Sequence, residues 1–187
     1  MRYNASGTKP RLLYFMILLL PVMMALLLYT WPQKKVSSTA FEVRDGLIYH
    51  IGSEVPFSGM VLDTVANKII EYNVVSGKKN GNFVVSNASG NVEVFGKITK
   101  NKNEGVWKYY YPDGKLESVG NFESDKLTGK WLWYYPDGSL KKVGFFHKGQ
   151  ENGKWVEYKQ SGDIKQEIYF LNGKVVNSVQ REELKSS

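Results

Sequence analysis

The chain has 187 residues, no cysteine and a formal net charge of +7 at pH 7. Without cysteine it can form no disulfide or zinc-thiolate site, and it has no cysteine nucleophile. Five basic residues and no acidic residue precede Glu42, whereas the other 20 of the 25 basic residues share the rest of the chain with all 18 acidic residues. Because the later part is nearly balanced in charge, we expect no nucleic-acid partner.

Residues 12–31, LLYFMILLLPVMMALLLYTW, contain no charged residue. Twenty such residues span about 30 Å as a helix, which matches the hydrocarbon core of a bilayer. We expect an uncleaved transmembrane signal anchor in the inner (cytoplasmic) membrane, preceded by a basic tail at residues 1–11. Basic residues flank both ends almost equally, so the orientation rests on the shortness of the tail, which favours repeats on the extracytoplasmic side. The alternative is a cleaved signal peptide ending near Ala40, which would give a secreted or periplasmic protein.

Residues 32–40 read as a short polar linker. Residues 41–58 then read as an entry hairpin, because Asp45-Gly46 lies between two extended runs and Asp-Gly favours a tight hairpin turn.

A 24-residue period begins at a degraded, shorter copy over 59–80 and continues as 81–104, 105–128, 129–152 and 153–176. Such a period indicates one supersecondary unit stacked on its neighbours. Each of the four full copies starts with glycine and carries an aromatic residue two positions later, a glycine at nine, an aliphatic residue at eleven and an apolar one at seventeen. The opening glycine and the aromatic residue are Gly81 and Phe83, Gly105 and Trp107, Gly129 and Trp131, and Gly153 and Trp155.

Each copy reads as strand, tight turn, strand and loop. The Tyr-Pro-Asp-Gly segments at 111–114 and 135–138 are turn sequences, because proline presets φ and glycine accepts positive φ. We therefore expect an all-β fold: an elongated antiparallel sheet of about ten strands, built from tandem 24-residue hairpins and preceded by one transmembrane helix. The tail, 177–187, has room for one short helix over 179–185, and the irregular copy that starts at Gly59 and the charges at 181–185 are the expected caps of the two sheet edges.

Alternation along the strands places aromatic side chains of successive copies on one face, where neighbouring hairpins align them in a row. The candidate binding residues are Trp107, Tyr109, Tyr111, Trp131, Trp133, Tyr135 and Trp155. The alternative interpretation is that these side chains form the core of the sheet. The two readings overlap, because a single-layer sheet leaves part of an aromatic face in water, and such patches mark binding sites.

The core pattern G-x-W-x-x-Y-x-x-x-G-x-L resembles bacterial MORN-repeat variant proteins, a group often labelled toxin–antitoxin system antitoxin. The entry segment Asp45–Tyr49 and the Pro56–Gly59 segment also resemble the usual start of that group, so the resemblance covers about residues 41–176. It implies an elongated hairpin sheet acting as a scaffold or binding surface. The copy 81–104 departs from the pattern, with Phe83 in place of tryptophan and Ser86 in place of tyrosine.

No pattern of catalytic, cofactor-binding or metal-binding residues is present. The two histidines, His50 and His147, have no partners at metal-ligand spacing, and Asp113 and Asp137 lie where turns favour aspartate. We therefore expect no enzyme, no cofactor and no metal.

The favoured hypothesis is a non-enzymatic, membrane-anchored β-repeat scaffold that binds a protein or an envelope surface through its aromatic face. The alternative, which follows from the resemblance, is an antitoxin-like neutraliser of a co-produced toxic protein.

Overall fold

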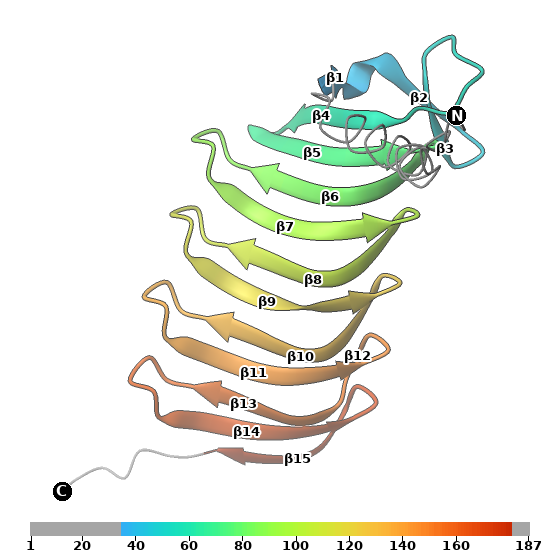
Figure 1. Cartoon of the computed structure of the whole chain (residues 1–187). Helices are drawn as coiled ribbons and strands as arrows, with labels where there is room; N and C mark the ends of the chain where they lie inside the picture. The colour runs from blue at the N-terminus through green and yellow to red at the C-terminus, as the bar shows by residue number, and fades with distance from the viewer. Residues whose placement is uncertain (1–34, 181–187) are drawn as a thin grey trace, which may run out of the picture. The chain divides into compact units, whose positions relative to one another are not determined.

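A computed structural model describes residues 35–180 of the chain (Figure 1). The expected membrane anchor at 12–31, the basic tail before it and the charged segment 181–185 lie outside the described residues. Within residues 35–180, no helix is long and apolar enough to cross a membrane.

The described part is all-β and contains no α-helix, only the short 3-10 helix η1 (Ser38–Ala40). Most of its strands have seven to nine residues and follow one another as successive hairpins. The strands are β1 (Lys35–Ser37), β2 (Phe41–Arg44), β3 (Leu47–His50), β4 (Gly59–Val65), β5 (Lys68–Val75), β6 (Lys78–Ser86), β7 (Val92–Thr99), β8 (Lys102–Tyr110), β9 (Leu116–Glu123), β10 (Lys126–Tyr134), β11 (Leu140–His147), β12 (Gln150–Glu151), β13 (Gly153–Tyr158), β14 (Ile164–Leu171) and β15 (Lys174–Gln180).

Thirteen strands form one elongated sheet in the order β1-β4-β5-β6-β7-β8-β9-β10-β11-β13-β14-β15, with β12 pairing β11. The repeats supply the ten strands that the sequence predicts. The other three are β1 at one edge, the short β12, and β15 at the far edge. The sheet is mixed, which corrects the expectation of a purely antiparallel one, because β1 pairs with β4 in parallel, Val36 beside Val61. This pairing covers backbone groups that an edge strand would otherwise leave open.

Two kinds of turn alternate along the sheet and account for its regular spacing. At the Tyr-Pro-Asp-Gly turns, Gly114 and Gly138 have φ of 86° and 90°. At the opposite ends of the strands the chain turns through two positive-φ residues, as at Ser124 and Asp125 with φ of 48° and 68°. Local sequence therefore determines where each strand ends, and the strands inherit the 24-residue period.

The entry hairpin forms as predicted, since β2 and β3 pair across Asp45-Gly46, with φ of 50° and 73°. It makes a separate two-stranded sheet whose backbone bonds to the large sheet: the Ile48 amide donates to the Gly77 carbonyl at 2.8 Å. Ile48 also packs with Val61 and Val74, which are 0% and 1% exposed. The hairpin therefore closes the first end of the large sheet with a small hydrophobic core.

Two expectations about the ends of the repeat region are wrong. Part of the expected linker at 32–40 is ordered structure, since β1 and η1 occupy residues 35–40. The short helix considered for 179–185 does not begin at Val179 or Gln180, which continue β15 beside β14, and the rest of that range lies outside the described residues. In both places a neighbouring strand edge offers hydrogen bonds, and pairing with it overrides a weak local preference.

Candidate binding face

A continuous row of aromatic rings crosses the sheet from β6 to β13 and is called the aromatic ladder here. Ring centroids of successive members lie between 5.5 and 6.5 Å apart. Its members are Phe83, Trp107, Tyr109, Trp131, Trp133 and Trp155. The register of the hairpins brings residues that are distant in sequence into contact, as side chains on one face of neighbouring strands do.

Phenylalanines from the second strands of the last three repeats pack edge-on against the tryptophans. Phe122 meets Trp131 at 5.6 Å with an interplanar angle of 83°, and Phe146 meets Trp155 at 5.1 Å and 81°. Edge-to-face contact places the positive ring edge against the negative ring face and stabilises each pair by about 0.5–1.5 kcal/mol beyond burial. The ladder is therefore a packed layer held between consecutive repeats.

Three tryptophans lie directly on glycines of the preceding strand. A Cβ atom added at Gly96, Gly120 or Gly144 would stand 2.2, 2.0 or 2.4 Å from the nearest ring atom of Trp107, Trp131 or Trp155, respectively. Only a residue without a side chain leaves room for the ring. These glycines recur 24 residues apart. They were missed by the sequence analysis, because the spacing marks a repeated position but does not show that a tryptophan ring of the next repeat lies against it.

Burial separates the members of the ladder into two groups. Trp107, Trp131 and Trp155 are only 4–5% exposed, so these three side chains are the core of the sheet. Phe83, at the first end of the ladder, and Tyr109 and Trp133, in its middle, are half-buried. Burial raises the pKa of Tyr109 above its ordinary value, which is the shift expected for a phenol partly removed from water. The part of the ladder open to a partner is therefore centred on Tyr109 and Trp133.

Indole nitrogens of the buried tryptophans are satisfied in two of three cases. Nε1 of Trp131 donates to the Asn121 carbonyl at 3.3 Å, and Nε1 of Trp155 donates to the Phe145 carbonyl at 3.2 Å. Nε1 of Trp107 is buried with no hydrogen-bond partner in the described part of the chain. Of the three buried indole groups, the one in the copy 105–128 therefore lacks a hydrogen bond.

Tyr111 and Tyr135 take a different role from the other predicted site residues. A register shift follows Tyr109 in β8, and Tyr111 lies past the strand end at the turn. Its hydroxyl donates to the Tyr134 carbonyl at 2.7 Å, and the hydroxyl of Tyr135 donates to the Tyr158 carbonyl at 2.8 Å. Five of the seven candidate residues therefore lie in the ladder, while these two tie each turn to the next repeat.

Further contacts link the turns from repeat to repeat. Lys115 Nζ donates to the Pro136 carbonyl at 2.9 Å, and Gln160 Nε2 donates to Asp137 Oδ2 at 2.6 Å. Hydrogen bonds from Ser139 and Gln160 lower the pKa of Asp137 to about 2. The aspartate expected for turn reasons therefore also joins neighbouring repeats.

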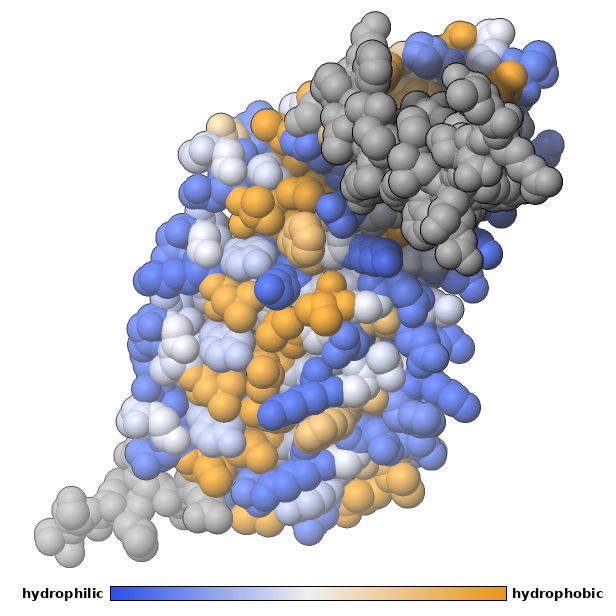
Figure 2. Space-filling view, in the orientation of Figure 1, coloured by the Kyte–Doolittle hydropathy of each residue, from blue (hydrophilic) through white to orange (hydrophobic). Residues whose placement is uncertain are grey.

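The sheet has a second surface with apolar character. Val106 and Phe145, which alternate away from the tryptophans along their strands, are 50% and 43% exposed. Figure 2 shows hydrophobic side chains gathered in a column across successive repeats, flanked by hydrophilic ones. Both faces therefore keep apolar area in water.

The structure offers no arrangement for metal chemistry in residues 35–180, where no three His, Asp or Glu side chains come together to hold an ion. His50 packs its ring against Phe41 at 5.1 Å, and His147 is exposed at the end of β11.

Comparison with protein families gives one match. Residues 103–124, 127–148 and 151–177 match the MORN repeat variant family. The matched segments carry most of the aromatic ladder and support a MORN-repeat protein. The copy 81–104, which departs from the pattern, lies almost wholly outside them. No curated protein matches the chain.

Solved structures that are weakly similar to the chain include these two. The crystal structure of TarM aligns at 15% identity and a TM-score of 0.36, covering 62% of this chain and 21% of that one. The structure of accessory secretory protein 1, 2 and 3 in Streptococcus pneumoniae aligns at 14% identity and a TM-score of 0.18, covering 77% and 21%. This chain spans about a fifth of each matched chain.

Proposed function

We propose that this protein is a non-enzymatic β-repeat scaffold that binds a partner protein through the exposed part of the aromatic ladder. In this proposal residues 12–31 anchor it in the inner membrane, and the repeats lie on the extracytoplasmic side. The observation that carries the proposal is the half-buried pair Tyr109 and Trp133, held on a rigid layer of buried tryptophans.

The physical argument is one of preorganisation. Tyr109 and Trp133 each contact Trp131, with ring centroids at 6.3 and 5.9 Å, so their rings are already positioned before a partner arrives. Rigid aromatic side chains lose little conformational entropy on binding and are enriched among residues that dominate interface energy. In the described part of the chain, the elements outside the large sheet are η1, β2 and β3, which belong to the first end of the sheet. They leave this part of the ladder uncovered.

The test is site-specific photo-crosslinking in intact cells. A photoreactive residue at 133 is expected to capture one defined protein. The matched control is position 132, where Leu132 is the chain neighbour that points to the other face. Crosslinks from 133 and none from 132 support the proposal. Equal capture from both positions, or no capture from 133, contradicts it.

A further inference from the structure

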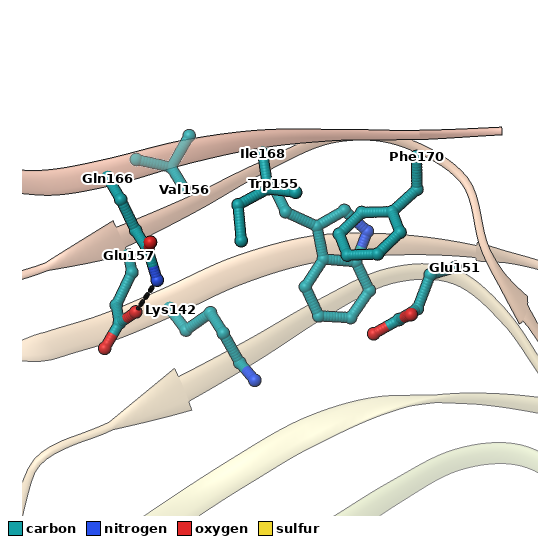
Figure 3. A pocket seen from close by; sticks show the side chains of 8 residues that line it. All are labelled: Lys142, Glu151, Trp155, Val156, Glu157, Gln166, Ile168 and Phe170. Atoms are coloured by element: carbon teal, nitrogen blue, oxygen red, sulfur yellow. Dashed lines mark hydrogen bonds between the residues drawn. The ribbon is translucent and has the colours of Figure 1, made fainter. Parts of the chain in front are cut away.

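A hollow of about 150 Å³ lies beside Trp155 in the last matched repeat (Figure 3). It is smaller than pockets for drug-sized ligands, which span roughly 300–1,000 Å³, and suits a single ring. Its lining combines apolar and polar side chains: Lys142, Glu151, Trp155, Val156, Glu157, Gln166, Ile168 and Phe170.

The hollow exists because this repeat departs from its neighbour. Glu157 stands 24 residues after Trp133, at the same place in the repeat, and Glu151 stands 24 residues after Leu127. In the preceding repeat the Trp133 ring packs against Trp131 at 5.9 Å. One repeat later a carboxylate replaces that ring, so the space beside Trp155 is not filled by an aromatic side chain. The position of Glu157 holds Tyr109 and Trp133 in the two preceding repeats, so an aromatic position of the repeat has become acidic at this place.

The polar groups are arranged on two sides of the indole. In Figure 3, Lys142, Glu157 and Gln166 lie on one side of Trp155, and Glu151 lies on the other side with Phe170. The carboxylate of Glu157 is fixed in place, since it accepts hydrogen bonds from Lys165 Nζ at 2.9 Å and from Gln166 Nε2. The lining therefore offers acceptors and donors around an aromatic floor.

The charges decide what kind of ligand fits. The ammonium group of Lys142 already lies over two indole rings, 4.4 Å from the centroid of Trp133 and 5.3 Å from that of Trp155. A cationic ligand would have to compete with this group for the rings. An anionic ligand would meet the carboxylates of Glu151 and Glu157. A neutral ligand with several hydroxyls can donate to the carboxylates and accept from Lys142 and Gln166.

We propose that this hollow is a binding site for a single ring of a neutral carbohydrate. The apolar C–H groups of the ring contact the half-buried Phe170 and Ile168 above the buried Trp155, and its hydroxyls exchange hydrogen bonds with the polar side chains around them. Partial burial alone would raise the pKa of Glu157, but the hydrogen bonds from Lys165 and Gln166 outweigh it and hold that pKa below its ordinary value. Glu157 therefore stays an ionised acceptor, whereas glycoside hydrolysis needs a carboxyl group with a raised pKa. The hollow borders the protein-binding pair, because Lys142 lies over the Trp133 ring and Trp133 contacts Trp155 at 5.5 Å, but Tyr109 and Trp133 are not part of its lining.

The test is a titration of the full-length protein, purified in a detergent without a sugar headgroup. The probes are glucose, galactose and N-acetylglucosamine and their trimers, with saturation-transfer NMR as the readout. We expect saturable binding in the millimolar range of at least one neutral sugar. Glucosamine and galacturonic acid, which carry a positive and a negative charge, are expected to bind about tenfold more weakly.

The decisive variant is Glu157→Trp, which restores the aromatic residue of the preceding repeat and fills the hollow. It should abolish sugar binding and leave the thermal unfolding midpoint unchanged or higher. Gln166→Ala, which removes one hydrogen-bonding side chain and keeps the hollow, should weaken binding about tenfold. The matched control is Glu167→Gln on the same strand, where Glu167 pairs with Lys154 Nζ at 2.9 Å outside the hollow.

Three results would overturn the proposal: no saturable binding of any neutral sugar, full binding by both Glu157→Trp and Gln166→Ala, or stronger binding of a charged sugar. None of these changes the crosslinking expected from position 133, so failure of this site and failure of the proposed protein-binding face are distinguishable.

Discussion

The indole ring of Trp131 lies against the backbone of Gly120 on the neighbouring strand, where an added Cβ atom would stand 2.0 Å from two ring carbons. The same relationship joins Trp155 to Gly144. In the repeat before these, Tyr72 takes the place of the glycine and pairs with Phe83, and in the last repeat Ile168 takes its place and pairs with Ser178. The glycine is therefore absent where the facing strand has no tryptophan. Tryptophan and glycine are therefore one structural unit, divided between consecutive repeats.

Replacing Gly120 with alanine should destabilise the repeat domain by about 1–3 kcal/mol, because the new methyl group displaces the Trp131 ring from a packed layer. Chemical denaturation followed by tryptophan fluorescence measures the change. Glu117→Ala, an exposed position on the same strand, is the control and should stay within about 0.5 kcal/mol of the parent protein. A Gly120→Ala protein as stable as this control would show that the close contact is not structural.

Trp131→Ala and Trp133→Ala should differ in their effects on stability. Trp131 is 4% exposed, so its removal leaves a cavity and should cost about 3–5 kcal/mol. Trp133 is half-buried and should cost less, because solvent can occupy part of the vacated space. Comparison of denaturation midpoints tests the order. Equal losses would mean that Trp133 belongs to the core as fully as Trp131, which would weaken its proposed role in partner binding.

Tyr111→Phe should lower the free energy of unfolding by about 1 kcal/mol, since the hydroxyl of Tyr111 donates to the Tyr134 carbonyl at 2.7 Å. Tyr110→Phe is the matched control. It removes a hydroxyl from the adjacent residue, and no turn-to-turn hydrogen bond is lost among the described residues. If the two variants prove equally stable, the hydroxyl of Tyr111 contributes nothing to the cohesion of the repeats.

Stability should fall in acid partly through Asp137. Its pKa is about 2 in the folded protein and 3.8 as the ordinary value, so folding favours the ionised form. The stabilisation is present above pH 4 and is lost as the pH falls toward 2. Asp137→Asn lacks this carboxylate, so the gap between its thermal unfolding midpoint and that of the parent protein should narrow over this range. Glu117→Gln provides the baseline. A gap that is constant from pH 5 to pH 2 would contradict the assignment.

The proposed anchoring predicts where protease can reach the repeats. In intact cells the repeats should be protected, and in spheroplasts, whose inner membrane is sealed, they should be digested. A cytoplasmic protein serves as the internal control for membrane integrity. Protection that persists until the inner membrane is lysed would reverse the proposed orientation. A measured mass that corresponds to a chain beginning after Ala40 would show a cleaved signal peptide in place of the anchor.

Local patterns made most of the architecture predictable. The hairpins follow from period-2 alternation and from turns such as Asp45-Gly46, whose positive φ values are inherent in those residues. The contact of Tyr109 with Trp131 also follows, because a constant period aligns equivalent residues of adjacent hairpins.

Features that depend on partners distant in the chain could not be predicted from the local sequence. β1 has only three residues, and nothing in Lys35-Val36-Ser37 shows that the edge of β4 will accept it in parallel. The role of Gly120 depends on a tryptophan from the next hairpin, so that glycine alone looks like an ordinary strand residue. The hollow at Glu157 arises from a departure from the repeat, and a search for agreement between copies passes over it.

The two ends of the large sheet are closed differently, and this gives the domain a direction of unfolding. At the first end, β1 and the entry hairpin cover the edge and bury Val61 and Val74. At the other end all seven residues of β15 are exposed. Because each repeat is stabilised mainly by its neighbours, opening should begin at β15 and proceed one hairpin at a time. Amide protons of β14 and β15 should therefore exchange with solvent first, and those of β4 and β5 last, so that exchange rates record distance from the open edge.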